Sequence, residues 1–399
     1  MPAPRFAPAD ILPEDADGAR LVGRVWLPSG AGRAGRPVPV AVADGAVHDL
    51  SHLAPTVSAL LASRELRGRL VAGEKGSRLF ALDALLAEGH VAEPMGARPH
   101  LLAPIDLHCV KAAGVTFAIS TIERVIEEAA RGNPASAADI RARIGERIGR
   151  DLARLKPGSP QAAELKQLLI AEGLWSQYLE VAIGPYAEVF TKAPVLASVG
   201  FGADVGVRSD SAWNNPEPEV VLVVSPAGEI VGATLGNDVN HRDIEGMSAL
   251  LLGKAKDNNA SCSVGPFIRL VDEGFTLDDI RRAQVGLALE GEDGFRMQAS
   301  SDMSKISRDI AELVEQTMGK FHQYPDGFVL FTGTLFAPVV DRDRKGAGFT
   351  HKVGDWVRIS SPRLGMLANR VEHTERVAPW RFGIGDMLAL ASERAWPSN

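Results

Sequence analysis

The second half of the chain alternates short apolar runs with turn signals, and this pattern constrains the fold more than any other feature of the sequence. After residue 192 such runs lie at 220–224, 230–235, 267–271, 285–289, 327–331 and 356–359. Apolar runs this short, separated by Gly, Pro, Asn and Asp, are typical of β-strands. The sequence therefore predicts an antiparallel or mixed β architecture for this half.

The first half is organised differently, and we expect two domains. Residues 1–100 are predicted to form a small β-containing domain with strands at 23–27 and 39–42, and a helix at 49–63 capped by Ser51 or Thr56. The Pro- and Gly-containing stretch 95–104 is a candidate linker. Residues 105–399 would form the larger domain, with a helix at 117–130 and a helical insertion of two or three helices at about 135–186. The simplest interpretation of the insertion is a structural support without a chemical role.

Charge and composition exclude several classes of protein. The formal net charge of −7 gives no electrostatic footprint for nucleic acid or an anionic membrane. No apolar stretch reaches the roughly 18 residues of a membrane-spanning helix, and the first residues lack the apolar core of a signal peptide. The two cysteines, Cys109 and Cys262, are too far apart in the sequence to suggest a disulfide framework. We therefore expect a cytoplasmic protein.

A cluster of carboxylates is predicted beside the first of the apolar runs. Glu217 and Glu219 stand two residues apart at its start, so their side chains face the same side of the strand. If Ala227-Gly228 form a two-residue hairpin loop, counting back along both strands places Glu217 opposite Asp238. Three carboxylates would then meet at one point.

A bound cation would account for such a cluster. Neighbouring carboxylates repel one another and are costly to bury without a compensating positive charge. The absence of His and Cys favours Mg²⁺ over Zn²⁺, and three oxygen ligands leave positions open for water and substrate. The alternative is a solvated acidic edge that holds no ion.

Five motifs in order over roughly residues 105–375 resemble those of the fumarylacetoacetate hydrolase superfamily. They are the Glu-x-Glu pair at 217–219, Asn-Asp-x-x-x-Arg-Asp at 237–243, the lysine loop 256–262, the stretch 298–303 and Thr-Gly-Thr at 332–334. The resemblance implies an α+β fold with a mixed β-roll, in which 105–399 is the catalytic domain. It also implies a homodimer or homotetramer.

The resemblance further implies a set of site residues. Glu217, Glu219 and Asp238 would bind Mg²⁺, with Mn²⁺ or Ca²⁺ as alternatives. The matched Lys256 would lie beside the substrate. Thr334, together with Gly333, would bind the substrate's carboxylate.

One segment departs from the pattern of the hydrolytic members. Residues 114–123 resemble their lid, and Glu123 is kept, but Ser120 stands where those members have a histidine that activates water. This departure favours elimination of water over hydrolysis. Either a neutral Lys256 removes the proton, or Glu123 removes it while charged Lys256 stabilises the enolate, and the sequence leaves both open. Ser120 and Arg124 are candidate substrate contacts, although the sequence by itself favours a solvated or structural arginine at position 124.

Within the family the chain looks most like the dehydratases of 2-keto-3-deoxy-pentonates. The stretches 213–219, 254–259 and 321–326 carry this resemblance. It implies that 2-keto-3-deoxy-D-xylonate or L-arabonate is converted to 2-oxoglutarate semialdehyde and water, with a small 2-oxo sugar acid as the only partner. The alternatives are a C–C bond hydrolase of a 2,4-diketo acid (acylpyruvate type) and a metal-stabilised binding protein without activity.

Overall fold

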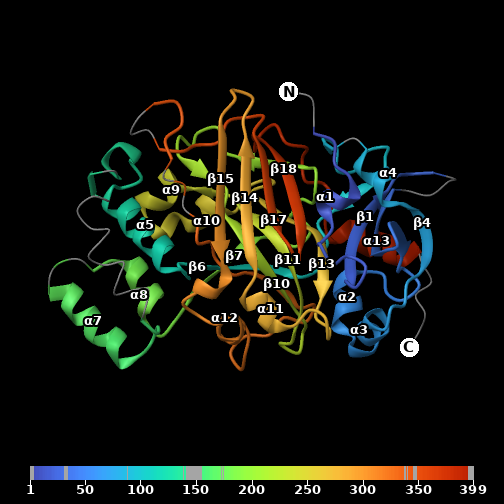
Figure 1. Ribbon diagram of the computed structural model, residues 1–399, viewed down its shortest axis with the longest axis horizontal. Helices are drawn as coiled ribbons and strands as arrows, with labels where there is room; N and C mark the ends of the chain where they lie inside the picture. Colours follow the sequence, from blue (N-terminus) through green and yellow to red (C-terminus); the bar gives the residue numbers. More distant parts are fainter. Residues whose placement is uncertain are drawn as a thin grey trace.

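Two large β-sheets lie at the centre of the molecule, with helices at both ends (Figure 1). The computed structural model describes residues 4–30, 35–87, 89–137, 139–140, 155–171, 173, 175–336, 338, 340–344 and 348–393. All statements below concern these residues.

The N-terminal elements lie at the right of Figure 1 and continue the larger sheet. Strand β1 pairs with β2 on one side and with β13 of the following part on the other. The strands predicted at 23–27 and 39–42 are thereby confirmed, while the domain boundary near residue 100 stays a prediction. The elements are α1 (Pro8–Ile11), β1 (Leu21–Leu27), β2 (Arg36–Ala43), β3 (Ala46–Asp49), α2 (Val57–Ala62), α3 (Arg64–Val71), β4 (Ser77–Ala81), α4 (Leu82–Leu86) and β5 (His100–Leu102).

The helix predicted at 49–63 is shorter than expected. It begins at Val57, and Thr56 is its N-cap, with the Thr56 hydroxyl accepting a hydrogen bond from the Ala59 amide at 3.0 Å. Pro55 explains the late start, because the residue before a proline is disfavoured in the helical conformation. Ser51 is not a cap, and its amide donates to the Asp49 carboxylate at 2.7 Å. The predicted linker is also partly ordered, because β5 pairs with β1.

The larger sheet has the strand order β4-β3-β2-β1-β13-β11-β10-β16-β6-β7, with β5 attached to β1. Its neighbours are antiparallel except for β16 and β6, which are parallel. The predicted runs at 220–224, 230–235, 267–271 and 327–331 all lie in this sheet. Its later strands are β6 (Cys109–Gly114), β7 (Glu188–Ala193), β10 (Pro218–Val224), β11 (Ile230–Asp238), β13 (Cys262–Leu270) and β16 (Phe328–Phe331).

A second sheet, of order β15-β14-β17-β18-β8, packs on the first through β10, β11 and β13. The main hydrophobic core combines apolar side chains of both sheets, among them Leu222, Leu235, Leu287 and Leu367. The arrangement confirms the predicted α+β class with mixed sheets. The strands are β8 (Asp204–Val207), β14 (Gln284–Glu290), β15 (Arg296–Asp302), β17 (Trp356–Ser361) and β18 (Gly365–His373).

Short elements complete the part that follows β8. A small two-stranded sheet joins β9 to β12, next to the end of the β10–β11 hairpin. These elements are β9 (Asn214–Asn215), β12 (Asn240–His241), α9 (Arg242–Met247), η1 (Ala249–Leu251), α10 (Leu252–Lys256), α11 (Leu277–Arg281), η2 (Met303–Lys305), α12 (Ile310–Thr317) and α13 (Ile384–Glu393).

The helices at the left of Figure 1 include the predicted lid and insertion. Helix α5 (Ala118–Ala129) confirms the helix predicted at 117–130, and Gly132, which has a φ of +70°, lies just past its C-terminal end. Helices α7 (Pro160–Ala171) and α8 (Gln177–Ile183) belong to the predicted insertion. Residues 141–154 of the predicted insertion lie outside the described residues. Leu169 and Leu179 pack with Val115 and Val125 in a separate core between the insertion and α5.

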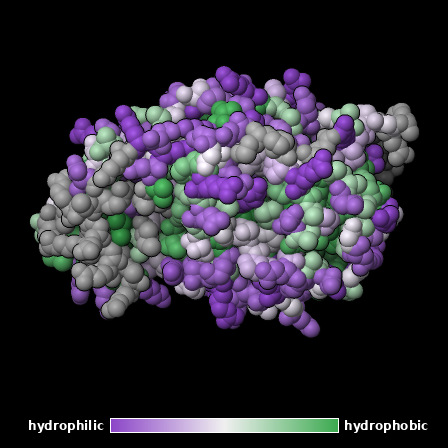
Figure 2. All heavy atoms as spheres, turned by 45° about the horizontal axis from the view of Figure 1, so that its top comes forward, coloured by the Kyte–Doolittle hydropathy of each residue, from purple (hydrophilic) through white to green (hydrophobic). Residues whose placement is uncertain are grey.

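No helix within the described residues is both long and apolar enough to span a lipid bilayer. Figure 2 shows that hydrophilic side chains cover most of the face it presents, with a more hydrophobic area toward the N-terminal strands on the right.

Candidate active site

The β10–β11 hairpin brings the predicted carboxylates together. Pro218 pairs with Asn237, and the Asp238 amide donates to the Glu217 carbonyl at 3.0 Å, so the predicted facing of Glu217 and Asp238 is confirmed. The predicted two-residue loop is wrong, because the Ser225 amide closes the turn on the Glu229 carbonyl at 2.9 Å. A register shift beside Val223 and Val224 compensates for the different loop, and the far ends of both strands meet as expected.

Glu217, Glu219 and Asp238 form a compact, buried carboxylate cluster. Each offers an oxygen within 4.8 Å of the other two, and the residues are only 2–3% exposed. Burial, and then repulsion from Asp238 and Glu217, raises the pKa of Glu219 well above its usual value. A divalent cation would remove this repulsion, and an all-oxygen donor set suits Mg²⁺. The residues present therefore fit a hard divalent cation.

Backbone and side-chain donors orient these carboxylates. The Gly333 amide donates to Glu219 Oε2 at 2.7 Å, and the Asn240 amide group donates to Glu217 Oε1 at 3.1 Å. The Glu217 backbone is held by Asn237, whose side-chain oxygen accepts from the Glu217 amide at 3.0 Å. Groups that orient a ligand influence metal affinity almost as strongly as the ligands themselves.

Two buried lysines border the cluster. Lys256, at the end of α10, bonds to Glu217 and lies 3.0 Å from Asp238 Oδ2. Burial lowers the pKa of Lys256, but the carboxylates of Asp238, Glu217 and Glu245 outweigh this effect and raise it. Lys256 is thus an ammonium group in the metal-free protein, which favours the second of the two mechanisms left open by the sequence.

The second lysine, Lys192, was not predicted. It is completely buried, with its Nζ 2.8 Å from Asp238 Oδ1 and bonded to the carbonyls of Val239 and Lys256. It therefore fixes one oxygen of a candidate metal ligand and also the end of helix α10, which carries Lys256. The segment around Lys192 has no long apolar run that would mark a buried strand, so the sequence holds no clear signal for this lysine.

Glu188 is the second residue that the sequence analysis missed. Glu188 and Phe190 alternate along β7 and share one face of the strand, and Lys192 follows at a register shift of β7 against β6. Lys192 contacts Asp238 and Phe190 lies 5.8 Å below the Lys256 ammonium, so Glu188 faces the same site. Its carboxylate packs against Gly114, where any side chain would collide with it. Burial, and then repulsion from Glu245, raises the pKa of Glu188 to about 7.

Arg124 of helix α5 also contacts the carboxylate cluster. Its guanidinium bonds to Glu217 and pairs with Glu127 at 2.6 Å and with Glu245 at 2.9 Å. Burial lowers the pKa of Arg124, but these three carboxylates raise it well above its usual value. Arg124 is thus buried beside the cluster and not solvated, and its role as a substrate contact stays a prediction.

Glu123 lies in a neighbouring ion-pair group. Its Oε2 is 3.4 Å from Nη2 of Arg242, a fully buried arginine that also pairs with Glu127 at 2.6 Å. Arg242 is held in addition by the ring of Trp213 and by the Pro338 carbonyl. The catalytic role assigned to Glu123 stays a prediction, and Glu188 is a second carboxylate for the same role.

The hydroxyl groups of the predicted substrate contacts are engaged within the protein. Ser120 Oγ donates to the Phe117 carbonyl at 2.9 Å, and Thr334 Oγ1 accepts from the Phe336 amide at 3.1 Å. Thr334 directly follows Gly333, whose amide holds Glu219, so it lies next to the cluster. Substrate binding by these residues stays a prediction.

Replacing Gly333 by Ala is expected to weaken Mg²⁺ binding about tenfold through displacement of Glu219. Gly333 has a φ of +92°, and an added Cβ would lie 1.9 Å from the Thr116 hydroxyl. The backbone must shift, and the bond from the Gly333 amide to Glu219 must weaken. Isothermal titration with Mg²⁺ measures the change, and Gly294→Ala, where φ is +84° but no atom lies near, is the matched control. Equal Mg²⁺ affinity in the two variants would contradict the expectation.

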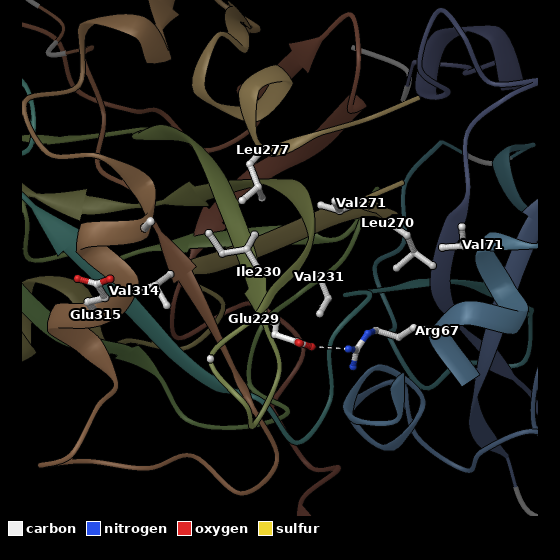
Figure 3. A pocket seen from close by; sticks show the side chains of 12 residues that line it. Arg67, Val71, Glu229, Ile230, Val231, Leu270, Val271, Leu277, Val314 and Glu315 are labelled. Atoms are coloured by element: carbon white, nitrogen blue, oxygen red, sulfur yellow. Dashed lines mark hydrogen bonds and ion pairs between the residues drawn. The ribbon is translucent and has the colours of Figure 1, made fainter. Parts of the chain in front are cut away.

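The cavity in Figure 3 is a different place in the molecule. It has a volume of about 530 Å³ and lies at the turn of the β10–β11 hairpin, the end opposite to the carboxylate cluster. Aliphatic side chains such as Val231, Leu270 and Leu277 line it, and an ion pair between Arg67 and Glu229, at 2.6 Å, crosses its rim. It contributes no carboxylate to the candidate site.

Fold, motif order and carboxylate cluster together define a class of protein. Residues 185–372 match the family model described as fumarylacetoacetate (FAA) hydrolase C-terminal. The chain is also 30% identical over 236 residues to 2-dehydro-3-deoxy-D-arabinonate dehydratase of Saccharolobus solfataricus, an alignment that covers 58% of this chain and 72% of that relative. The chain belongs to the fumarylacetoacetate hydrolase family, as the motifs indicated.

A second relative is a probable 2-keto-3-deoxyxylonate dehydratase of Haloferax volcanii, 33% identical over 194 residues. That alignment covers 49% of this chain and 63% of the relative, so the chain spans under two thirds of its length.

Solved structures share the fold. One is 2-keto-3-deoxy-D-arabinonate dehydratase in its apo form, with a TM-score of 0.60 and 22% identity over 88% of this chain and 99% of that one. Another is described as 2-keto-3-deoxy-D-arabinonate dehydratase complexed with magnesium and 2,5-dioxopentanoate, with a TM-score of 0.59 and 23% identity over the same shares. Both likenesses confirm the predicted fold of the family.

Proposed function

We propose that the chain is a Mg²⁺-dependent dehydratase of a 2-keto-3-deoxy sugar acid, with 2-keto-3-deoxy-D-xylonate or L-arabonate as the substrate. The observation that carries the proposal is the buried cluster of Glu217, Glu219 and Asp238, with Lys256 at its edge. The names of both relatives support a pentonate dehydratase and differ in the sugar acid.

The charges around the cluster suit the removal of a proton next to a 2-oxo group. A divalent cation held by the carboxylates would withdraw electrons from the 2-oxo acid and acidify its C3 protons. The Lys256 ammonium adds a second positive charge beside the oxygen where negative charge develops. The chain thus offers electrostatic stabilisation from two directions.

Glu188 is the residue that we propose as the base. A general base works best when its pKa lies near the operating pH, and that of Glu188 is about 7. It shares a strand face with Phe190, whose ring lies 5.8 Å from the Lys256 ammonium. Glu123, paired with Arg242, is the alternative base, as the resemblance implies.

The elimination balances without a further reactant. A proton leaves C3 and the hydroxyl group leaves C4, and together they form one molecule of water. A proton then moves from C5 to C3 of the unsaturated product, which gives the enol of the semialdehyde. Transfer of the enol's hydroxyl proton to C4 gives 2-oxoglutarate semialdehyde. The substrate's own carboxylate would be held by Arg124, Thr334, Gly333 and Ser120. Of these, Arg124 and the Gly333 amide contact carboxylates of the cluster.

Product analysis tests the proposal. Incubation with 2-keto-3-deoxy-D-xylonate or L-arabonate and Mg²⁺ is expected to release a semialdehyde, detected through its oxidation by an aldehyde dehydrogenase with NAD(P)⁺. Addition of a chelator should stop the reaction. Formation of pyruvate from a 2,4-diketo acid, without semialdehyde from either pentonate, would establish the C–C hydrolase instead. Absence of both reactions would favour a binding protein.

A further inference from the structure

Arg124 stands out because one guanidinium lies among three buried carboxylates. It contacts Glu217, a candidate metal ligand, and it pairs with Glu127 and Glu245. A bound cation would occupy Glu217, and Glu127 is already shared with Arg242, whose Nε and Nη2 both lie 2.6 Å from Glu127 Oε1. Glu127 still holds Arg124 through its other oxygen, Oε2, at 2.6 Å. Glu245 is therefore the one carboxylate of the three that is neither a candidate metal ligand nor paired with a second arginine.

Glu245 is well suited to this task. It is 3% exposed and pairs with Arg124 at 2.9 Å, and no second cation lies at ion-pair distance from it in the described part of the chain. The contact is an ion pair and not an aligned hydrogen bond, since Oε2 has no bonded donor. Burying a carboxylate with a single ion-pair partner costs folding free energy. We therefore expect Glu245 to have a function that offsets this cost.

The helical insertion contacts the backbone of Glu245. Tyr178 of α8 is 3% exposed, and its hydroxyl donates to the backbone carbonyl of Glu245 at 3.3 Å. Helix α8 is itself anchored, because the buried Arg308 donates to the carbonyls of Val181 and Gly184 at 3.0 and 2.6 Å. Contacts thus run from the insertion through Tyr178, Glu245 and Arg124 to Glu217.

We propose that Glu245 is a positioning residue that directs Arg124 toward the carboxylate of a 2-oxo acid substrate, and that the helical insertion supports it through Tyr178. The inference rests on the proposed function and adds two residues to it. An arginine recognises a carboxylate best when its planar fork is held in one orientation. The insertion is then part of substrate recognition and more than a structural support.

The test separates the binding of the acid from the binding of the metal. The probe is 2-oxopentanoate, a five-carbon 2-oxo acid that has no hydroxyl group to eliminate. Its Kd is measured by isothermal titration in saturating Mg²⁺, and the Kd of Mg²⁺ alone is measured separately. Thermal unfolding and far-UV circular dichroism confirm that each variant is folded.

Four variants give distinct expected results. Glu245→Met should weaken 2-oxopentanoate about tenfold while Mg²⁺ affinity stays within about twofold. Glu245→Gln, which keeps an acceptor oxygen, should recover most of this loss. Tyr178→Phe should weaken 2-oxopentanoate about threefold. Glu128→Gln is the matched control, because Glu128 joins α5 to the insertion through Ser176 and Gln177 but does not contact Arg124.

Three outcomes would overturn the inference. Wild-type affinity for 2-oxopentanoate in folded Glu245→Met removes the role of Glu245, and if that variant does not fold, wild-type affinity in Tyr178→Phe is the deciding result. If Glu128→Gln loses as much affinity for 2-oxopentanoate as Glu245→Met, the cause is general loosening of the insertion and not the contact of Glu245 with Arg124. If the wild-type protein itself does not bind 2-oxopentanoate with Mg²⁺, the proposed function fails and this inference fails with it.

Discussion

Replacing Glu219 by Gln is expected to lower dehydration activity about 10³-fold, because a bound cation supplies several kcal/mol of charge stabilisation in the transition state. Glu219 is 3% exposed and presents its oxygens to the same point as Glu217 and Asp238. An uncharged Gln leaves the cluster with one negative charge fewer, and Mg²⁺ binding should weaken in parallel. Steady-state kinetics and isothermal titration with Mg²⁺ measure the two effects.

The same variant should be more stable than the wild-type protein when metal is removed. Burial and the neighbouring Asp238 and Glu217 raise the pKa of Glu219 above its usual value of 4.5. A carboxyl group with a raised pKa contributes stability that is complete below pH 4.5 and is lost as the pH rises through the folded-state value. Glu219→Gln removes this loss, so its melting temperature in a chelator should exceed that of the wild type at neutral pH.

Glu229→Gln is the control on the same hairpin. Glu229 lies at the opposite end and pairs with Arg64 and Arg67 near the surface. Its replacement should leave both activity and Mg²⁺ affinity unchanged. If Glu219→Gln keeps full activity after chelation, Glu219 is not a metal ligand and the metal argument fails.

Replacing Glu188 by Gln should reduce kcat between about 10²- and 10⁴-fold, the usual contribution of a general base. Mg²⁺ affinity should change little, since Glu188 is not part of the cluster of three carboxylates. In the wild-type protein kcat/KM should rise with pH as Glu188 loses its proton, around pH 7 in view of its pKa of about 7. A bound cation would shift this rise to lower pH, and the rise should be absent in Glu188→Gln.

The stability of the metal-free protein gives an independent check on Glu188. Because its pKa is raised from 4.5 to about 7, the wild-type protein loses stability as the pH rises through this window. Glu188→Gln should therefore be more stable above pH 7, by about 1–2 kcal/mol after allowance for its partial exposure to solvent. Chemical denaturation in a chelator at pH 5 and pH 8 measures the difference, which should be small at pH 5.

Glu123→Gln completes the comparison of the two candidate bases. If this variant loses activity and its pH dependence while Glu188→Gln stays active, the base is Glu123, and Glu188 only shapes the pocket. A loss confined to Glu188→Gln would reverse the role that the family resemblance implies for Glu123. The ion pair of Glu123 with Arg242 would then give Glu123 a structural role on helix α5.

Much of the carboxylate cluster was predictable because it depends on local rules. Strand parity placed Glu217 and Glu219 on one face, and hairpin register placed Asp238 opposite Glu217. The predicted turn was wrong, yet the register was correct, because the longer loop and the register shift beside Val223 offset each other. The right result thus depended on a compensation that the sequence does not reveal.

Glu188 and Lys192 were missed for a physical reason. They lie on β7, which directly follows the predicted insertion, and the chain there has no long apolar run to mark a strand. Its place at the edge of the sheet beside β6 is set by pairing with a segment more than seventy residues earlier, from Gly114↔Glu188 to Val110↔Ala193. The function of polar residues on such a strand depends on the side chains that the fold places opposite them, and the sequence of the strand does not specify these.

The sequence by itself determined the strand pattern, the α5 helix with its Gly132 end, the meeting of Glu217, Glu219 and Asp238, and membership of the family. These features follow from periodicity, turn chemistry and motif order, which act over a few residues or one hairpin. Only the tertiary structure decided which lysine and arginine side chains surround the cluster and that Lys256 is charged there. It also decided that Tyr178 contacts Glu245 and that Glu245 pairs with Arg124. Burial and charge pairing are properties of side chains brought together from distant segments, and no local pattern records them.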